Sequence, residues 1–260
     1  MGGKPDDSYN MIEIKNVKKS FDGREILAGV SATFHQGKTN LIIGSSGTGK
    51  SVLLKVIVGI IPPDEGLVLY NNRDFYKSDL TIVRQIRREI GMLFQGGALF
   101  DSKTVEENVR FPLEMLTTLS KYEMQERAQF CLKRVGLEAA GNKMPSEISG
   151  GMKKRVGIAR AIVLNPRYLF CDEPNSGLDP QTSTKIDNLI QEITAEYNIT
   201  TVVVTHDMNS VMEIGEQITF LSQGHKLWEG NSDEMFDSGV EALDQFVFSN
   251  KLMRGYRNTH

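Results

Sequence analysis

Short apolar runs separated by turns organise the first part of the chain. Two runs within residues 12–34 flank a turn at Asp22-Gly23, and a third run, Asn40 to Ile43, stops at a glycine. Apolar runs of this length are typical of strands, and the third run suits a strand buried on both faces. The pattern therefore predicts a β-rich first region.

A helix is predicted directly after the third run. It begins at Gly49 or Lys50, and its apolar positions recur at helical spacing. The predicted inner face carries Val52, Leu53, Val56 and Ile57. Residues 62–66 end this helix, because proline and glycine favour turns, and a strand follows over residues 67–70.

The pattern changes between residues 104 and 164, where helical runs follow one another with breaks near Gly136 and Pro145. Strands resume at residues 168–171 and 201–204, with a helical stretch from Gln181 to Tyr197 between them. A strand, a helix and a strand in this order predict parallel strands joined by a right-handed crossover. We therefore expect an α/β fold with an inserted helical region.

Apolar residues also recur at helical intervals near the end of the sequence. The pattern predicts a docking tail and leaves its target open. Its apolar positions are Leu243, Val247, Phe248, Leu252 and Tyr256.

Composition narrows the classes of function. A chain of 260 residues with 40% hydrophobic residues suits one domain, and a net charge of −3 argues against a nucleic-acid partner. No run approaches the roughly 20 apolar residues of a membrane-spanning helix, and the first residues lack the apolar stretch of a signal peptide. We therefore expect a cytoplasmic protein in which Cys131 and Cys171 are buried and structural.

The candidate chemistry begins in the loop after the third strand. Gly44, Gly49, Lys50 and Ser51 fill the pattern G-x-x-x-x-G-K-[ST] between an apolar strand and a helix. Glycines let backbone N–H groups approach phosphates, and the start of a helix adds its positive dipole end. Lys50 is expected to reach the β and γ phosphates of a nucleotide, and Ser51 to bind Mg²⁺.

Two acids, Asp172 and Glu173, end the apolar strand that begins at Tyr168. The carboxyl ends of strands face the crevice in which α/β sheets bind ligands. Asp172 therefore suits Mg²⁺, directly or through water. Glu173 suits the base that orients the attacking water.

Further motifs make the chain resemble the ATP-binding cassette (ABC) family. Residues 148–152, Ile-Ser-Gly-Gly-Met, resemble its signature sequence, with isoleucine and methionine in place of the common leucine and glutamine. Gln95 stands where the Q-loop glutamine belongs, and residues 176–179 resemble the D-loop. His206 corresponds to the switch histidine, and Phe21 to the aromatic residue that stacks on adenine.

The resemblance implies a P-loop NTPase core with a parallel, RecA-like sheet, an antiparallel β subdomain and an inserted α-helical subdomain. One domain then covers residues 1–260, with its core in residues 8–95 and 165–238. The helical subdomain covers about residues 96–164, and the tail covers residues 239–260.

The resemblance also implies ATP as substrate, Mg²⁺ as cofactor and a role for each matching residue. The expected catalytic residues are Glu173, His206, Gln95 and Lys50, and the expected metal-binding residues are Ser51, Gln95 and Asp172. The expected nucleotide-binding residues are Phe21, Gly44, Ser45, Ser46, Gly47, Thr48, Gly49, Lys50, Ser51, Val52, Ser149, Gly150, Gly151 and Asp179.

The signature bears on the oligomeric state. Ser149, Gly150 and Gly151 open a predicted helix, which offers a second set of N–H donors to an anion. One triphosphate does not need two helix starts from different regions of one chain. The resemblance resolves this point, because it implies a head-to-tail homodimer in which the signature of one copy covers ATP bound by the other.

Several other polar residues receive simpler interpretations. The run Lys153-Lys154-Arg155 is expected to face solvent or a neighbouring phosphate, and not nucleic acid. His35, His225 and His260 are expected to be ordinary surface residues.

Two stretches, residues 47–54 and 92–101, resemble the Mla-type, Mce-associated lipid-transport ATPases. That resemblance implies an Mla-type membrane permease and an Mce-domain substrate-binding subunit as partners. It implies phospholipid as cargo between bacterial membranes, and a peripheral place on the cytoplasmic side of the inner membrane. Gly96, Gly97 and Ala98 carry little side chain, which allows close approach of a partner helix.

Three alternatives stay open at this point. The chain can power an importer or exporter of another substrate. A soluble ABC ATPase of DNA repair or translation is disfavoured, because a second cassette, a long coiled coil and added basic elements are missing from this sequence. A GTPase is disfavoured because residues 142–145, Asn-Lys-Met-Pro, lack the acid of the guanine-reading motif.

Overall fold

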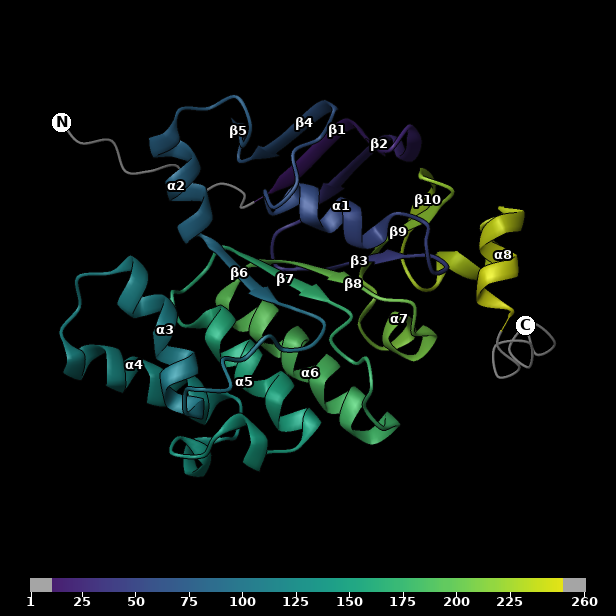
Figure 1. Cartoon of the computed structure of the whole chain (residues 1–260). Coiled ribbons are helices and arrows are strands. Elements are labelled where there is room, and N and C mark those ends of the chain that lie inside the picture. Colours follow the sequence, from purple (N-terminus) through teal and green to yellow (C-terminus); the bar gives the residue numbers. More distant parts are fainter. Residues whose placement is uncertain (1–10, 250–260) are drawn as a thin grey trace.

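The computed structural model describes residues 11–249, which form two sheets and a helical layer (Figure 1). The strands are β1 (Ile12–Phe21), β2 (Arg24–Phe34), β3 (Thr39–Ile43), β4 (Glu65–Tyr70), β5 (Arg73–Asp74), β6 (Ile90–Leu93), β7 (Tyr168–Asp172), β8 (Thr200–Val204), β9 (Gln217–Ser222) and β10 (His225–Gly230). The helices are α1 (Lys50–Ile57), α2 (Leu80–Arg88), α3 (Val105–Leu116), α4 (Lys121–Arg134), α5 (Gly150–Ile162), α6 (Pro180–Tyr197), α7 (Met208–Ile214) and α8 (Glu241–Val247).

The central sheet has the strand order β10-β9-β3-β8-β7-β6. Its neighbours from β9 to β6 run parallel, and β10 is antiparallel to β9. The second sheet, of order β2-β1-β4-β5, is antiparallel throughout. The predicted mixed α/β fold, with a parallel core sheet and a separate antiparallel sheet, is confirmed.

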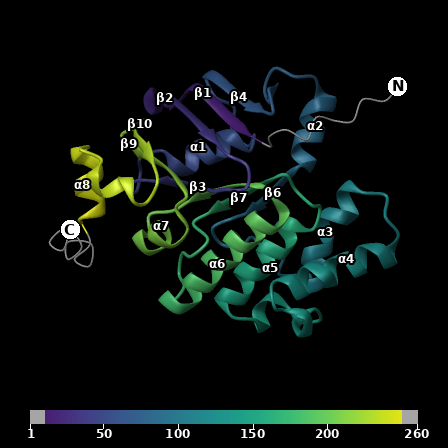
Figure 2. The same cartoon turned by 180° about the vertical axis from the view of Figure 1, so that it is seen from behind.

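Two apolar layers cover the central sheet, one on each face. Ile42 and Phe170 point toward α1 and the antiparallel sheet, whereas Leu41 and Cys171 point toward α5 and α6. Views from opposite sides both place α1 and the helix pair α5–α6 on opposite faces of the sheet (Figures 1 and 2). Because β3, β7 and β8 are buried on both faces, they read as continuous apolar runs.

The predicted elements lie close to the observed ones. The turn at Asp22-Gly23 joins β1 to β2, and the predicted helix begins at Lys50. Within α1, Leu54 is fully buried and Val52 is only half-buried, so the inner face is rotated slightly from the prediction. The helical run after residue 104 contains α3, α4 and α5.

Capping explains where these helices begin. Thr104 and Ser120 start α3 and α4 with complete capping boxes, in which each hydroxyl accepts from the N3 backbone and the N3 glutamate accepts from the cap N–H.

The two cysteines are buried as predicted, because Cys131 and Cys171 are both fully shielded within one apolar cluster.

The end of the described chain returns to its own core. Leu243 and Val247 of α8 are buried, and Phe246 packs against Phe220 of β9 at 5.6 Å between ring centroids. Through Val247, the predicted docking tail therefore docks on its own domain. Leu252 and Tyr256 lie outside the described residues.

Within residues 11–249, every helix is too short or too polar to cross a bilayer.

Candidate functional site

The loop between β3 and α1 has a backbone that depends on glycine. Gly44, Gly47 and Gly49 have φ values of 147°, 79° and 101°, which L side chains rarely adopt. A Cβ atom at Gly44 would also lie 2.2 Å from the backbone oxygen of Leu221. The first and last glycines of the motif, Gly44 and Gly49, are therefore required because a Cβ atom would clash with neighbouring backbone.

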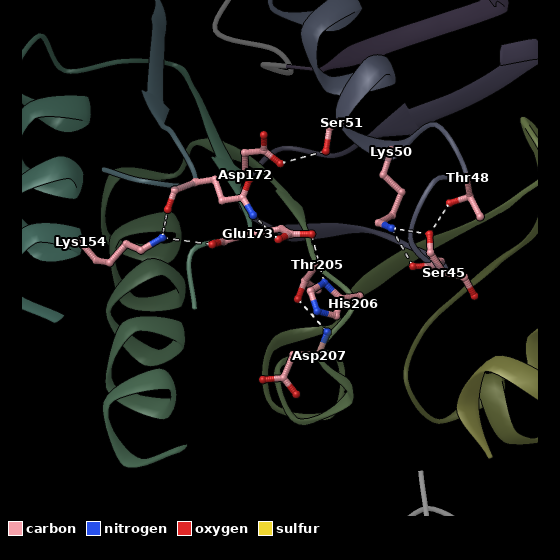
Figure 3. Close-up of polar contacts among 12 residues, drawn as sticks. Ser45, Thr48, Lys50, Ser51, Lys154, Asp172, Glu173, Thr205, His206 and Asp207 are labelled. Atoms are coloured by element: carbon pink, nitrogen blue, oxygen red, sulfur yellow. Dashed lines mark hydrogen bonds and ion pairs between the residues drawn. The ribbon is translucent and has the colours of Figure 1, made fainter. Parts of the chain in front are cut away.

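Lys50 lies at the start of α1 with its ammonium group folded under this loop (Figure 3). Its Nζ donates to the carbonyl oxygens of Gly44 at 2.7 Å and Ser45 at 2.8 Å. Thr48 Oγ1 donates to the same Ser45 oxygen at 2.9 Å. Burial lowers the pKa of Lys50, and attraction from Glu173 and Asp172 opposes that shift.

The two acids at the end of β7 point in different directions. Asp172 continues the strand, and its Oδ1 accepts from Ser51 Oγ at 3.4 Å. Glu173 has a positive φ of 46°, and its N–H donates to the carbonyl of Val204 at 2.9 Å. Burial and the charge of Glu173 raise the pKa of Asp172. A cation placed between Ser51 and Asp172 would relieve this crowding of negative charge.

Ser51 and Asp172 present the oxygen donors that Mg²⁺ prefers. No group of three or more His, Cys, Asp or Glu side chains suited to a metal occurs within residues 11–249. The residues therefore fit an ion that takes a single carboxylate and a few neutral oxygen donors from the protein and completes its shell with phosphate and water.

The Glu173 carboxylate is held from both sides (Figure 3). Gln95 Nε2 donates to Glu173 Oε2 at 2.7 Å, and His206 Nδ1 lies 3.1 Å from Glu173 Oε1. These residues follow β6, β7 and β8, three neighbouring parallel strands, so their shared sheet edge brings them together. The grouping can orient a water molecule beside a phosphate, since the carboxylate accepts its proton and the flanking groups fix the geometry.

One hollow joins the aromatic residue to the phosphate loop. Phe21, at the end of β1, lines it together with Val52 and Glu173. The Phe21 ring is 41% exposed, and Lys19 Nζ lies 5.4 Å from the ring centroid. An exposed ring at the mouth of a phosphate-binding loop can stack on a base.

The signature residues open α5 as predicted. Ser149 is the N-cap, and its Oγ accepts from the N–H of Met152 at 3.3 Å. A Cβ atom at Gly151 would lie 2.5 Å from Thr182 Cγ2, so the signature packs closely against α6. Asp179 caps α6 and accepts from the N–H of Thr182 at 3.0 Å.

Within residues 11–249, no hydrogen bond or ion pair joins the signature to the phosphate loop. Among the hydrogen bonds and ion pairs of residues 11–249, those of Ser149 and Asp179 run to their own helices, and those of Lys50 run to its own loop. A single copy therefore assembles Lys50, Asp172, Gln95, Glu173 and His206, but leaves the signature outside that group.

One prediction about the basic run is wrong. Lys154 does not face solvent: it is 5% exposed, and its Nζ donates to the carbonyl oxygens of Gln95 and Glu173. Helical spacing contained a usable signal, because Lys154 shares a face of α5 with the buried Ile158 and Ala161. Arg160, which sequence reasoning did not single out, donates to the carbonyls of Gly97 and Ala98 at 2.7 Å each.

Comparisons with known proteins agree with this geometry. The model of the ABC transporter family matches residues 27–176. The chain is 36% identical to the probable ribonucleotide transport ATP-binding protein mkl of Mycobacterium leprae, over 93% of this chain and 70% of that protein. It is 38% identical to the methionine import ATP-binding protein MetN of Clostridioides difficile, over 91% of this chain and 74% of that protein.

A solved structure is similar over most of the chain. It is the ATP-binding cassette MJ0796, a dimer in a post-hydrolysis state bound to ADP and Pi, with a TM-score of 0.77 and 36% identity over 85% of this chain and 98% of that chain. The names of these three proteins do not mention lipids, so the comparisons lend no specific support to the Mla-type branch. The chain belongs to the ABC transporter family, as an ATP-binding and ATP-hydrolysing subunit of such a transporter.

Proposed function

We propose that two copies of this chain hydrolyse Mg²⁺-ATP as a head-to-tail dimer and thereby drive a membrane permease. The observation that carries the proposal is the Glu173 carboxylate, which Gln95 and His206 hold from opposite sides at the edge of the sheet. Such a fixed carboxylate next to a phosphate loop suits the orientation of a water molecule for attack.

Within one copy, different residues bind the adenine, the phosphates and Mg²⁺ and act on the attacking water. Phe21 stacks on the adenine, while Val52 and the loop from Gly44 to Ser51 surround the phosphates through backbone N–H groups and the Lys50 ammonium. Ser51, Asp172 and Gln95 bind Mg²⁺, which neutralises charge on the β and γ phosphates when bound. Glu173 accepts the proton of the attacking water.

The other copy completes the site. Ser149, Gly150 and Gly151 present the free N–H groups at the start of α5 to the γ phosphate, and Asp179 follows on the neighbouring helix. The separation of these groups from Lys50 in one chain supports this arrangement, as does the dimeric state of the related cassette MJ0796.

Replacing Glu173 by glutamine tests the role of its carboxylate. Glu173→Gln keeps the size of the side chain and an oxygen that can accept from Gln95 but removes the base, so we expect hydrolysis to fall by about 100-fold or more while ATP still binds. A nucleotide-bound dimer should then accumulate, which light scattering and retained ATP would detect. Turnover at the wild-type rate would refute the role of Glu173.

For the cargo, we propose phospholipid, moved by a permease of the Mla type with an Mce-domain subunit on the cytoplasmic side of a bacterial inner membrane. The support is the resemblance of residues 47–54 and 92–101 to that branch, where Gly96 is exposed and a Cβ atom there would meet nothing within 4 Å. The names of the two relatives favour a second candidate, import of a small polar solute such as methionine or a ribonucleotide.

These two candidates differ in what stimulates hydrolysis. The chain would be purified together with its membrane permease and placed in nanodiscs. Phospholipid cargo predicts an ATPase rate that responds to an Mce-domain subunit and to lipid composition, and is indifferent to methionine and nucleosides. Stimulation by the small solutes through a soluble binding protein would overturn the lipid assignment and leave the ATPase mechanism intact.

A further inference from the structure

One face of α5 is built to hold the segment that follows β6. Lys154, Gly157 and Arg160 recur at three-residue intervals, which places them on neighbouring positions of the helix surface. Gly157 allows close approach, because a Cβ atom there would lie 2.6 Å from Leu93 Cδ1. Arg160 binds the far end of the segment through the carbonyls of Gly97 and Ala98.

Lys154 differs from Arg160 because it bridges two segments. Its Nζ donates to the carbonyl of Gln95, 59 residues away, and to the carbonyl of Glu173, 19 residues away, at 3.2 Å. It therefore ties the signature helix to both the Q-loop and the end of β7. Figure 3 shows the ammonium reaching Glu173 from α5, on the side opposite the His206 contact.

A buried ammonium is costly unless its N–H groups find acceptors and opposite charge lies near. Lys154 is 5% exposed, and desolvation lowers its pKa while Glu173 and Asp172 draw the pKa back up. An apolar side chain would pack on α5 at lower cost. The position thus favours a role beyond packing, in fixing the two carbonyls and balancing the two acids.

The two residues that Lys154 grips through their main chains also meet through their side chains, since Gln95 Nε2 lies 2.7 Å from Glu173 Oε2. We propose that Lys154 is a positioning residue for hydrolysis, which fixes the backbones of Gln95 and Glu173 to the signature helix. Displacement of α5 then moves the carboxylate relative to the attacking water. The inference rests on the proposed role of Glu173.

The test compares three variants of the full chain. Lys154→Met keeps the length of the stem and removes all donors, Lys154→Gln keeps two donors without the charge, and Lys153→Met is the matched control one residue earlier on α5. We expect Lys154→Met to lower kcat by about 10-fold or more, while the Kd for Mg²⁺-ATP changes by less than about 3-fold. The kcat of Lys154→Gln should fall between wild type and Lys154→Met, and Lys153→Met should match wild type.

A double-mutant cycle separates positioning from general damage. If Lys154 acts through Glu173, adding Lys154→Met to Glu173→Gln should leave the residual single-turnover rate unchanged within about 2-fold, because coupled residues are not additive. Equal losses in both backgrounds would overturn the inference, as would a kcat for Lys154→Met equal to or above that of Lys154→Gln. Should Glu173→Gln itself retain full turnover, the proposed function fails first, and the two failures remain distinct.

Discussion

Two buried lysines, Lys50 under the phosphate loop and Lys154 on the signature helix, solve the same physical problem in different ways. They are 6% and 5% exposed, and each donates to two backbone carbonyls. Burial lowers the pKa of both, and Glu173 and Asp172 attract both. Lys50 takes its carbonyls from its own loop, 5 and 6 residues away, whereas those of Lys154 come from two distant segments.

The sequence separation between each lysine and its carbonyl partners indicates its role: Lys50 is suited to bind phosphate, and Lys154 is suited to position other residues. The partners of Lys50 lie in one loop next to it in sequence, so its ammonium can exchange carbonyls for phosphate oxygens without disturbing the sheet. The partners of Lys154 lie in the segments that follow β7 and β6, and these segments carry the Glu173 carboxylate and the Gln95 amide that donates to it. Releasing them would disturb the geometry of the site.

The comparison between Lys50 and Lys154 can be tested most strongly through nucleotide affinity, where we expect the largest effect. Lys50→Met removes a charged donor from the phosphates, and two such hydrogen bonds contribute about 3–6 kcal/mol, or roughly 100- to 20,000-fold in Kd. Titration calorimetry with Mg²⁺-ATP would measure this loss, with Lys154→Met as the comparison. Equal losses of affinity in the two variants would show that the two lysines do not divide binding from positioning.

A pair of glycines, one beside each lysine, sharpens the comparison through stability. Gly44→Ala places a Cβ atom 2.2 Å from the Leu221 backbone oxygen at a φ of 147°, which should lower the free energy of unfolding by about 2–5 kcal/mol. In Gly157→Ala the only contact under 3.0 Å would be with the tip of the Leu93 side chain, the Gly97 backbone would lie at ordinary contact distance, and the helix gains propensity. Its free energy of unfolding should stay within about 1 kcal/mol of wild type.

Urea unfolding followed by circular dichroism would measure both glycine variants. A loss for Gly157→Ala as large as that for Gly44→Ala would contradict the steric argument, because it would mean that α5 and β6 cannot adjust at their contact.

The smallest expected change is in the pH dependence of stability, and it comes from a buried acid that has no lysine as an ion-pair partner within residues 11–249. Asp187 on α6 is 2% exposed, accepts from Asn175 Nδ2 at 2.8 Å, and has a pKa raised to about 6, chiefly by burial. Because the folded pKa lies above the unfolded value of about 3.9, stability from this group is full below pH 4 and is lost as pH rises to about 6. Asp187→Asn should remove this loss, which amounts to about 2–3 kcal/mol.

The measurement is the difference in free energy of unfolding between Asp187→Asn and wild type from pH 4 to 7.5. It should grow with pH in favour of the variant, whose amide can also donate to the Asn175 Oδ1 that accepts no hydrogen bond among the described residues. A flat difference would place the Asp187 pKa near its ordinary value.

Local patterns made the phosphate loop and the core strands predictable from sequence. The loop needs glycine at fixed positions beside a buried strand, so spacing alone indicates both its shape and its chemistry. The two acids at the end of β7 were equally predictable from the sequence, because the ends of parallel strands converge on one edge of the sheet. The D-loop, the signature and the switch histidine required family resemblance, since each is an ordinary loop or cap by itself.

The burial of Lys154 was missed because its cause is tertiary. A run of three cations normally lies on a solvated helix face, and that expectation outweighed the helical spacing that groups Lys154 with the buried face of α5, which packs against β6. The docking target of α8 stayed open for a similar reason, since an apolar helix face does not specify what it packs against.

The shielding of the two native cysteines makes this chain ready for distance measurements by spin labels or fluorophores. Burial raises the pKa of the Cys131 thiol to about 11 and that of Cys171 further, so neither presents a reactive thiolate at neutral pH. A cysteine introduced at an exposed place, such as Lys121 on α4, would therefore be labelled selectively in the otherwise natural sequence. The proposed closing of two copies around ATP can then be tested with the interior untouched.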